Sequence, residues 1–312
     1  MTAAAAEPLE LHAKPASRWA VLTRLLRNLS GAVGLVLVTV YAVIALMGAV
    51  GLTPHPPNAQ NPRDRLQAPS ADYIMGTDLF GRDVASRVMI GASNSLRVAL
   101  LSVAMSSLLG TLIGVTAGFV GGAVDTVLMR IMDVFFAFPA LLLALVIVTV
   151  LGPGLDNAII AIAVVYTPIF ARVARAPVLS VKEMEYVTAA RCIGTSGPRI
   201  LFRHVLPNAL APLIVQVSLA LSWSLLTEAG LSFIGLGAVP PAASWGVMLN
   251  ESRALAENAP WLIFFPGLAI ALSVLGFNLL GDGLRDVLDP RMRRGGGVVA
   301  GRRTPGRQAA GR

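Results

Sequence analysis

The sequence predicts an all-α polytopic membrane protein with six transmembrane helices, and three observations support this fold class. Of the 312 residues, 55% are hydrophobic and 13% are charged, whereas a soluble domain is about 25% charged. Six runs without charged residues have lengths that suit a hydrocarbon core of about 30 Å. The chain has a net charge of +8, and most of its Lys and Arg residues lie in every second segment between these runs. Membrane proteins that keep their basic loops in the cytoplasm show the same distribution.

The first predicted helix occupies residues 29–52 and follows a basic tail, residues 1–28, which holds four Lys or Arg residues. Its core, Ser30–Leu52, carries no charge. This run is long enough to span the bilayer and too long for the apolar core of a signal peptide. We therefore expect an uncleaved transmembrane helix at this position.

Five further runs mark the other helices. They are Val98–Val124, Val134–Leu155, Asn157–Ala171, His204–Thr227 and Asn258–Gly281, and after Glu228 the apolar pattern of the fourth run resumes through Gly237. The third of these is short, and we expect it to continue past Arg172, whose long side chain can snorkel to the interface. The core transmembrane domain is thus predicted at residues 95–290. The tail that follows, residues 291–312, is rich in Gly and Arg, a composition typical of disorder.

The distribution of Lys and Arg predicts the orientation. Six spans place both termini on one side of the membrane. If that side is the cytoplasm, the inside segments hold four, one, six and eight Lys or Arg residues, which is 19 of the 25. The positive-inside rule therefore favours a multi-pass protein of the inner cell membrane with both termini cytoplasmic. The same bias explains why the net charge is positive, so we do not expect the protein to bind nucleic acid.

Residues 53–94 are predicted to form an extracytoplasmic loop. Its first part is rich in proline and should be extended, and the stretch "MGTDLFGRDVASR" should be ordered on the outer surface. Asp83 and Arg87 are spaced as an i,i+4 ion pair on a helix. Further on, Gly110, Gly114 and Gly118 recur every four residues and would let another helix approach closely. That stripe is compatible with ordinary membrane packing and with a helix that slides during transport.

The central stretch "EYVTAARCIGTSGPRILFRHVLP", Glu185–Pro207, is too polar to span a bilayer. Its pattern predicts a helix that ends at Gly194, a turn, a second helix begun by Pro198, and a boundary with the next span at Pro207. Met184, Val187 and Ala190 share one face of the first helix, and Ile200, Leu201, His204 and Val205 share one face of the second. The segment is either a basic cytoplasmic loop or a docking element whose apolar stripe is buried against a partner.

Glu228 is the one acidic residue well inside a predicted apolar span. Ionisable residues within the membrane are functional candidates by default. Glu228 could line the pathway as a gate, pair with a neighbouring helix as a structural lock, or lie at the outer interface if the span ends nearby.

The central stretch resembles the cytoplasmic signature of ABC importer permeases, written E-A-A, three residues, G, nine residues, I, one residue, L-P. Five positions fit it: Ala189, Ala190, Gly194, Leu206 and Pro207. Thr188 stands in place of the glutamate, and His204 in place of the isoleucine. Glu185, one turn earlier, is a candidate substitute for the missing carboxylate. The resemblance implies that the ATPase-coupling residues are Glu185, Thr188, Ala189, Ala190, Arg191, Gly194, Thr195, Ser196, Leu206 and Pro207.

Other stretches narrow the resemblance, which runs from about Arg18 to Arg294. "MGTDLFGRDVASR", "MRIMDVFFAFPALLLAL", "EAGLSFIGLGAVPPAASWG" and "LLGDGLRDVLDPRMR" are similar to the second, C-type permease of dipeptide, oligopeptide and nickel transporters. This family implies a type I importer permease fold with cytoplasmic coupling helices. It also implies four partners: a homologous sister permease, two cytoplasmic ATPase subunits and an extracytoplasmic solute-binding protein. Membrane lipids would surround the permease. Short peptides, nickel chelates and glutathione-like solutes all remain open as substrates.

The chain is not expected to be an enzyme or to hold a cofactor. The phosphate-binding pattern G-x-x-x-x-G-K-[ST] does not occur, and neither Lys14 nor Lys182 follows a glycine, so ATP and Mg²⁺ are expected on the partner ATPases. The three histidines are far apart and support no metal site. "GTSG" at 194–197 matches the letters of a membrane serine protease but lies in a polar turn. The main rival function is a secondary transporter or channel without an ATPase, which would require more charges within the membrane than Glu228 alone.

Overall fold

The structure is a computed structural model that describes residues 18–288, and the elements of this part are helices joined by turns and loops. The α-helices are α1 (Arg18–Arg27), α2 (Leu29–Ala49), α3 (Val84–Val120), α4 (Gly122–Phe136), α5 (Ala140–Leu151), α6 (Leu155–Val181), α7 (Glu185–Cys192), α8 (Gly197–Ile200), α9 (Leu206–Phe233), α10 (Trp245–Ser252) and α11 (Trp261–Leu288). Short turns of other helix types are η1 (Pro62–Asp64), η2 (Leu201–Val205) and η3 (Arg253–Leu255).

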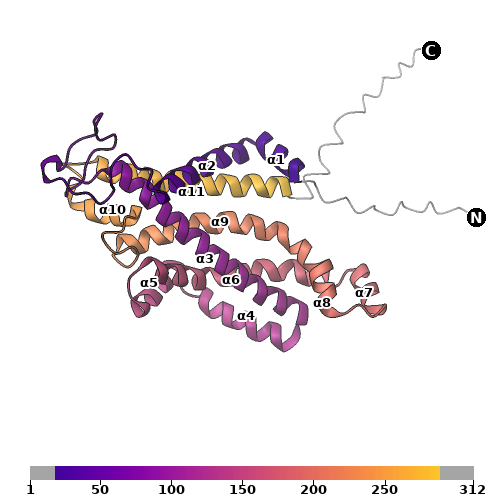
Figure 1. The fold of residues 1–312 in the computed structure, drawn as a ribbon. Coiled ribbons are helices and arrows are strands. Elements are labelled where there is room, and N and C mark those ends of the chain that lie inside the picture. The colour runs from indigo at the N-terminus through magenta and orange to yellow at the C-terminus, as the bar shows by residue number, and fades with distance from the viewer. Residues whose placement is uncertain (1–17, 289–312) are drawn as a thin grey trace, which may run out of the picture.

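The long helices form a bundle with two distinct ends (Figure 1). The loop between α2 and α3 lies with α10 at one end, called here the α10 end. The short helices α7 and α8 lie at the opposite end, called here the α7 end. The central segment and the predicted extracytoplasmic loop are therefore separated by the full length of the bundle.

The predicted spans are present, and one of them is broken. Helices α2, α3, α6, α9 and α11 are each long and apolar enough to cross a membrane, and α4 with α5 adds a sixth span if this pair, bent by 90°, counts as one. The bend falls at Phe138-Pro139, where proline disfavours a helical conformation for the residue before it. The span predicted at Val134–Leu155 is thus present as a broken pair of helices that begins earlier, at Gly122.

The non-helical part of the predicted loop 53–94 is shorter than expected, because α3 begins at Val84. Asp83 is the N-cap of α3, and its carboxylate accepts a hydrogen bond from the backbone N–H of Ser86 at 3.0 Å. The predicted tail 1–28 likewise contains a helix, α1, from Arg18 onward. Residues 1–17 and the predicted tail 291–312 lie outside the described residues.

The predicted ion pair between Asp83 and Arg87 is wrong, because the cap turns the Asp83 carboxylate back toward the backbone. Arg87 instead lies 3.4 Å from Glu251 and 3.8 Å from Asp78. Arg82 pairs with Asp78 at 2.5 Å and with Glu251 at 2.8 Å. These four buried or half-buried charged residues join the loop to the start of α3 and to α10, and so fix the α10 end.

Helices α3 and α6 pack at very short range, as the glycine stripe predicts. A Cβ atom on Gly114 would lie 2.0 Å from the carbonyl oxygen of Ala171, and one on Gly110 would lie 2.5 Å from Phe170 Cβ. Contacts this close between helix backbones require glycine. The stripe therefore acts in packing in this conformation.

Candidate functional site

The central segment, defined here as residues 184–207, forms a helix, a tight turn and a second helix at the α7 end. Gly194 has a φ of +79°, as the sequence predicts. The N–H of Gly194 donates to the carbonyl of Arg191, and the N–H of Thr195 donates to that of Ala190, both at 3.0 Å. This pair of bonds is the Schellman arrangement, which satisfies the last carbonyls of a helix when the following residue is left-handed.

The predicted boundary at Pro207 coincides with the start of α9 at Leu206, but the helical backbone is not interrupted there. Residues 197–233 run without a break through α8, the π-type turn η2 and α9. The wide turn η2 lies immediately before α9, and Pro207 occupies the first turn of α9, where a missing N–H costs little. The turn at Gly194 is thus connected to the transmembrane helix α9 through a continuous helical backbone.

The apolar stripe of the central segment is buried within the chain itself. Val187, Ile200 and Val205 are 0–1% exposed and belong to one core cluster with Val178 and Val181 of α6. The prediction that this stripe is buried against a partner is therefore wrong, because α6 already covers it. The packing attaches the segment firmly to α6 as well as to α9.

Three apolar side chains are free to meet a partner at the α7 end. Met184, Ile193 and Phe202 are 45%, 83% and 67% exposed. Met184 belongs to the predicted stripe but is the N-cap of α7 and stays uncovered, whereas the sequence pattern missed Ile193 and Phe202. We call these three the exposed apolar residues of the central segment.

The structure brings all ten predicted coupling residues to the α7 end. Most of them are exposed, namely Glu185, Thr188, Ala189, Arg191, Gly194, Ser196 and Pro207. Ala190, Thr195 and Leu206 are half-buried. Thr188, in the place of the signature glutamate, bonds weakly to its own helix at Met184 O, at 3.5 Å. The set can therefore present a surface to a partner, and contact with an ATPase stays a prediction.

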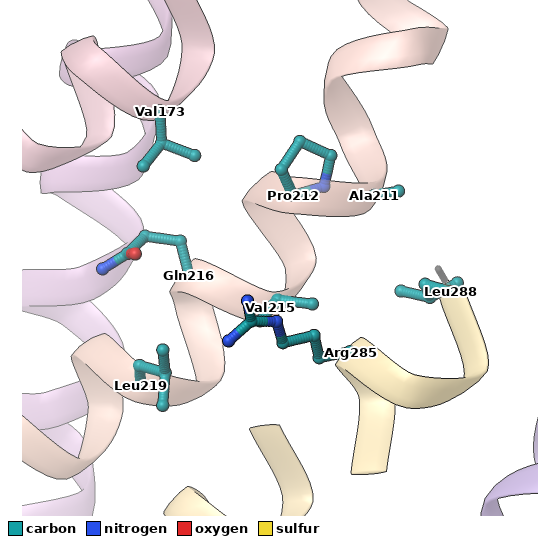
Figure 2. A pocket seen from close by; sticks show the side chains of 8 residues that line it. All are labelled: Val173, Ala211, Pro212, Val215, Gln216, Leu219, Arg285 and Leu288. Carbon is teal, nitrogen blue, oxygen red and sulfur yellow. The ribbon is translucent and has the colours of Figure 1, made fainter. Parts of the chain in front are cut away.

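A groove opens between α6, α9 and α11 (Figure 2). It has a volume of about 390 Å³ and is lined by Val173, Ala211, Pro212, Val215, Gln216, Leu219, Arg285 and Leu288. Arg285 extends from α11 toward α9. Gln216 is buried, and its Nε2 is among the described side-chain atoms that lack a hydrogen-bond partner. The sequence analysis missed this groove, although positions 211, 215 and 219 follow one helix face.

Glu228 is fully buried in α9, with an exposed fraction of 0%. The hydroxyl of Ser95 on α3 donates to its Oε2 at 2.8 Å, and the hydroxyl of Ser232 donates to its Oε1 at 2.7 Å. The chain itself thus covers Glu228 on all sides, and because α9 ends at Phe233 an interfacial depth stays a prediction. The link between α3 and α9 is what a structural lock requires, and a gating role stays a prediction.

We expect Glu228→Leu to destabilise the chain, because it removes this link and leaves two buried hydroxyl groups without their acceptor. Each such loss costs about 1–3 kcal/mol, so the thermal midpoint in detergent should fall by several degrees. Glu228→Gln has the same shape and keeps one acceptor, so it should stay close to the original midpoint. If Glu228→Gln keeps the midpoint but loses transport in the assembled complex, Glu228 is a gate rather than a lock.

Two ion pairs join α4 and α6, and the sequence analysis missed both. Arg175 binds Asp125 through Nε and Nη2, each at 2.6 Å. Arg172 binds Asp133 through Nη2 at 2.7 Å and stacks over the ring of Phe136 at 4.1 Å. The helix continues past Arg172 to Val181, as expected. Asp125 and Asp133 flank the predicted runs Val98–Val124 and Val134–Leu155, and both arginines follow Ala171, so Glu228 stays the one acidic residue inside a predicted apolar span.

The comparisons with protein families match most of the chain. Residues 110–294 match the family model described as "Binding-protein-dependent transport system inner membrane component". Residues 17–69 match the "N-terminal TM domain of oligopeptide transport permease C". The two matches together cover the first helix and nearly all of the core membrane domain.

Curated relatives agree with the family match. The dipeptide transport system permease protein DppC of Alkalihalophilus pseudofirmus is 46% identical over 86% of this chain and 88% of that protein. The di/tripeptide permease DppC of Pseudomonas aeruginosa is 44% identical over 84% and 89%. The glutathione transport permease GsiD of Pectobacterium atrosepticum is 45% identical over 74% and 77%.

A solved structure supports the fold. A chain of the inward-facing methionine ABC transporter MetNI has a TM-score of 0.54, with 19% identity, and the match covers 64% of this chain and 96% of that one. At this identity the likeness concerns the fold alone, which is that of an ABC importer permease. By the family model and the 46% identity together, this chain belongs to the binding-protein-dependent transport system inner membrane components, the permease family of ABC importers.

Proposed function

We propose that this chain forms half of the translocation pathway of an ATP-driven importer for short peptides. A homologous sister permease would form the other half, two cytoplasmic ATPase subunits would hold ATP and Mg²⁺, and an extracytoplasmic solute-binding protein would deliver the peptide. The names of the relatives, which include dipeptide, di/tripeptide and glutathione permeases, support peptides as the substrate class.

The observation that carries the proposal is the construction of the central segment. Its turn at Gly194 and its exposed apolar residues lie at one end of the bundle, where an ATPase can contact them. Its backbone continues into α9, and its buried stripe packs on α6. Because α6 and α9 both line the groove, a push on the turn would move two of its walls together. Closure of the ATPase pair would then switch the pathway between its inward-facing and outward-facing states.

The proposed orientation places the α7 end in the cytoplasm and the α10 end outside. The excess of Lys and Arg in the sequence segments that were predicted to be cytoplasmic supports it. In this orientation both termini are cytoplasmic, and the loop from Thr53 to Asp83 faces the solute-binding protein. The chain itself would carry out no catalysis.

The rival function, a secondary transporter, differs in needing no ATPase. The match to the permease family of ABC importers is evidence against it.

The test is to purify the tagged chain from its native membrane and to identify the subunits that accompany it. We expect a second permease and ATPase subunits, with peptide-stimulated ATP hydrolysis. Ile193→Asp should release most of the ATPase, because it places a charge on the most exposed apolar residue of the central segment. Ile74→Asp is the matched control, since Ile74 is 65% exposed at the α10 end. A chain that purifies alone and transports without ATP would contradict the proposal.

A further inference from the structure

Two polar side chains of the groove between α6, α9 and α11 have no partner in the described part of the chain (Figure 2). Gln216 is only 9% exposed, and its Nε2 makes no hydrogen bond within residues 18–288. Arg285 is exposed and forms no ion pair within the same residues. The carboxylate of Asp286 beside it accepts a hydrogen bond from Asn28 of α1 at 2.9 Å. The donors of Gln216 and Arg285 are therefore available to a ligand.

These donors favour a ligand that carries negative charge. The guanidinium of Arg285 presents a planar fork of N–H groups, which matches the geometry of a carboxylate. A buried amide without a partner is costly, so a ligand that brings an acceptor to Gln216 gains from binding there. No acidic side chain is found among the described residues that line the groove, so a cation would have no counterpart.

The remaining walls of the groove are apolar. They are formed by six residues: Val173, Ala211, Pro212, Val215, Leu219 and Leu288. The volume of about 390 Å³ lies within the range of about 300–1,000 Å³ that is usual for small-molecule sites, and such sites typically combine apolar walls with a few placed polar groups. The groove therefore suits a small ligand with an anionic end and an apolar body.

A short peptide matches this chemistry better than a phospholipid does. Its C-terminal carboxyl group has a pKa of about 3.5 and is charged at neutral pH, so it can pair with Arg285. The carbonyl oxygen of its last peptide bond lies one residue away and can accept from Gln216. A phospholipid could place its phosphate on Arg285, but its hydrocarbon tail would leave the buried amide of Gln216 without an acceptor.

We infer that the groove binds the C-terminal end of a short peptide. Arg285 holds the carboxylate, Gln216 donates to the last peptide carbonyl, and the apolar walls surround the last side chain. The inference rests on the proposed function, which makes peptides the cargo. It adds that this chain selects a free C-terminus and an apolar last residue, and that the groove does not recognise the peptide's ammonium group.

The test measures binding in the groove directly, with the purified complex in phosphatidylcholine nanodiscs and without solute-binding protein or ATP. Ala211, a half-buried lining residue, is changed by Ala211→Cys in a Cys192→Ser background, and labelling of this position by a thiol reagent is followed. Dialanine should slow the labelling, and N-acetyl dialanine should do so at similar concentrations. The C-terminal amide of dialanine should need a concentration about tenfold higher or more, because it lacks the charge that Arg285 binds.

Two variants separate the roles of the polar residues. Arg285→Gln should raise the dialanine concentration for half protection by about tenfold or more and should not change the value for the amide. Arg285→Lys should restore part of the protection. Gln216→Leu should weaken dialanine and its amide alike, since both carry the peptide carbonyl. It should not lower the thermal midpoint of the peptide-free complex, because it removes a buried group that has no partner, whereas a purely structural glutamine would be missed.

The controls use positions away from the groove. Ala269→Cys is matched to Ala211→Cys, because Ala269 is half-buried on α11 about 24 Å before Arg285, and dialanine should not affect its labelling. Arg97→Gln removes an arginine that pairs with Asp156 at 2.9 Å and should leave protection at Ala211→Cys unchanged.

Three results would overturn the inference. They are equal protection by dialanine and its amide, protection that Arg285→Gln does not weaken, and loss of protection when phosphatidylglycerol is added to the nanodiscs, which would show an anionic lipid in the groove. ATP-driven uptake is measured with the same complex. Uptake without any protection would contradict this inference alone, and absence of ATP-driven uptake would contradict the proposed function.

Discussion

Gly194→Val is expected to abolish ATP-driven transport while leaving the membrane helices intact. Gly194 has a φ of +79°, a region in which a β-branched residue is an outlier. No atom lies within 4 Å of the added Cβ, so the effect comes from backbone strain rather than from a clash. The Schellman bonds to Ala190 and Arg191 should break, and the surface offered to the ATPase should change shape. The measurements are the ATPase stoichiometry of the purified complex and uptake in vesicles.

Gly51→Val is the matched control for that experiment. Gly51 has a φ of +76°, and, as at Gly194, nothing lies within 4 Å of an added Cβ. Gly51, however, follows α2 at the α10 end. It should cause similar backbone strain and leave the binding of the ATPase unchanged. Full stoichiometry and normal uptake in Gly194→Val would show that the central segment is only a cytoplasmic loop.

Gly114→Val is expected to prevent the chain from folding or accumulating. Its Cβ would lie 2.0 Å from the carbonyl oxygen of Ala171 and within 3.0 Å of two further backbone atoms of that residue. A side chain can change its rotamer to avoid a clash, but a helix backbone cannot. The clash therefore forces α3 and α6 to separate along their length. The cost should exceed the roughly 1–3 kcal/mol of ordinary overpacking. The measurements are membrane yield and the thermal midpoint in detergent.

Gly267→Val provides the comparison for the packing prediction. Gly267 lies in α11, and no atom is within 4 Å of an added Cβ. It introduces the same side chain into another membrane helix without a clash. A Gly114→Val chain with the yield and midpoint of Gly267→Val would contradict the close packing of α3 on α6.

Composition and charge-free runs were sufficient to predict the helical membrane fold, because hydrocarbon demands long apolar helices. The break between α4 and α5 was missed, since Phe138-Pro139 interrupts a helix without interrupting its apolar character. The start of α3 was missed because Arg87 in its second turn, which suggested a loop, is paired with Asp78 and Glu251. The family itself was identified from motifs, and both comparisons confirm it.

The candidate site was predictable in position and less so in its contacts. The turn at Gly194 follows from local rules for helix ends. Whether the stripe around Val187 meets a partner or the chain's own α6 depends on tertiary packing, which periodicity does not contain. The pairing of Arg172 with Asp133 also joins residues far apart in sequence, so a search for charges within single apolar runs could not find it.

The most direct test of the account is uptake by the complete complex in proteoliposomes with a defined sidedness. Peptide-loaded binding protein is supplied on the side of the α10 end, and ATP on the side of the α7 end. We predict accumulation of peptide only with this arrangement, in proportion to ATP hydrolysed, and its loss in Gly194→Val. Accumulation driven by an ion gradient in the absence of ATP would contradict the account.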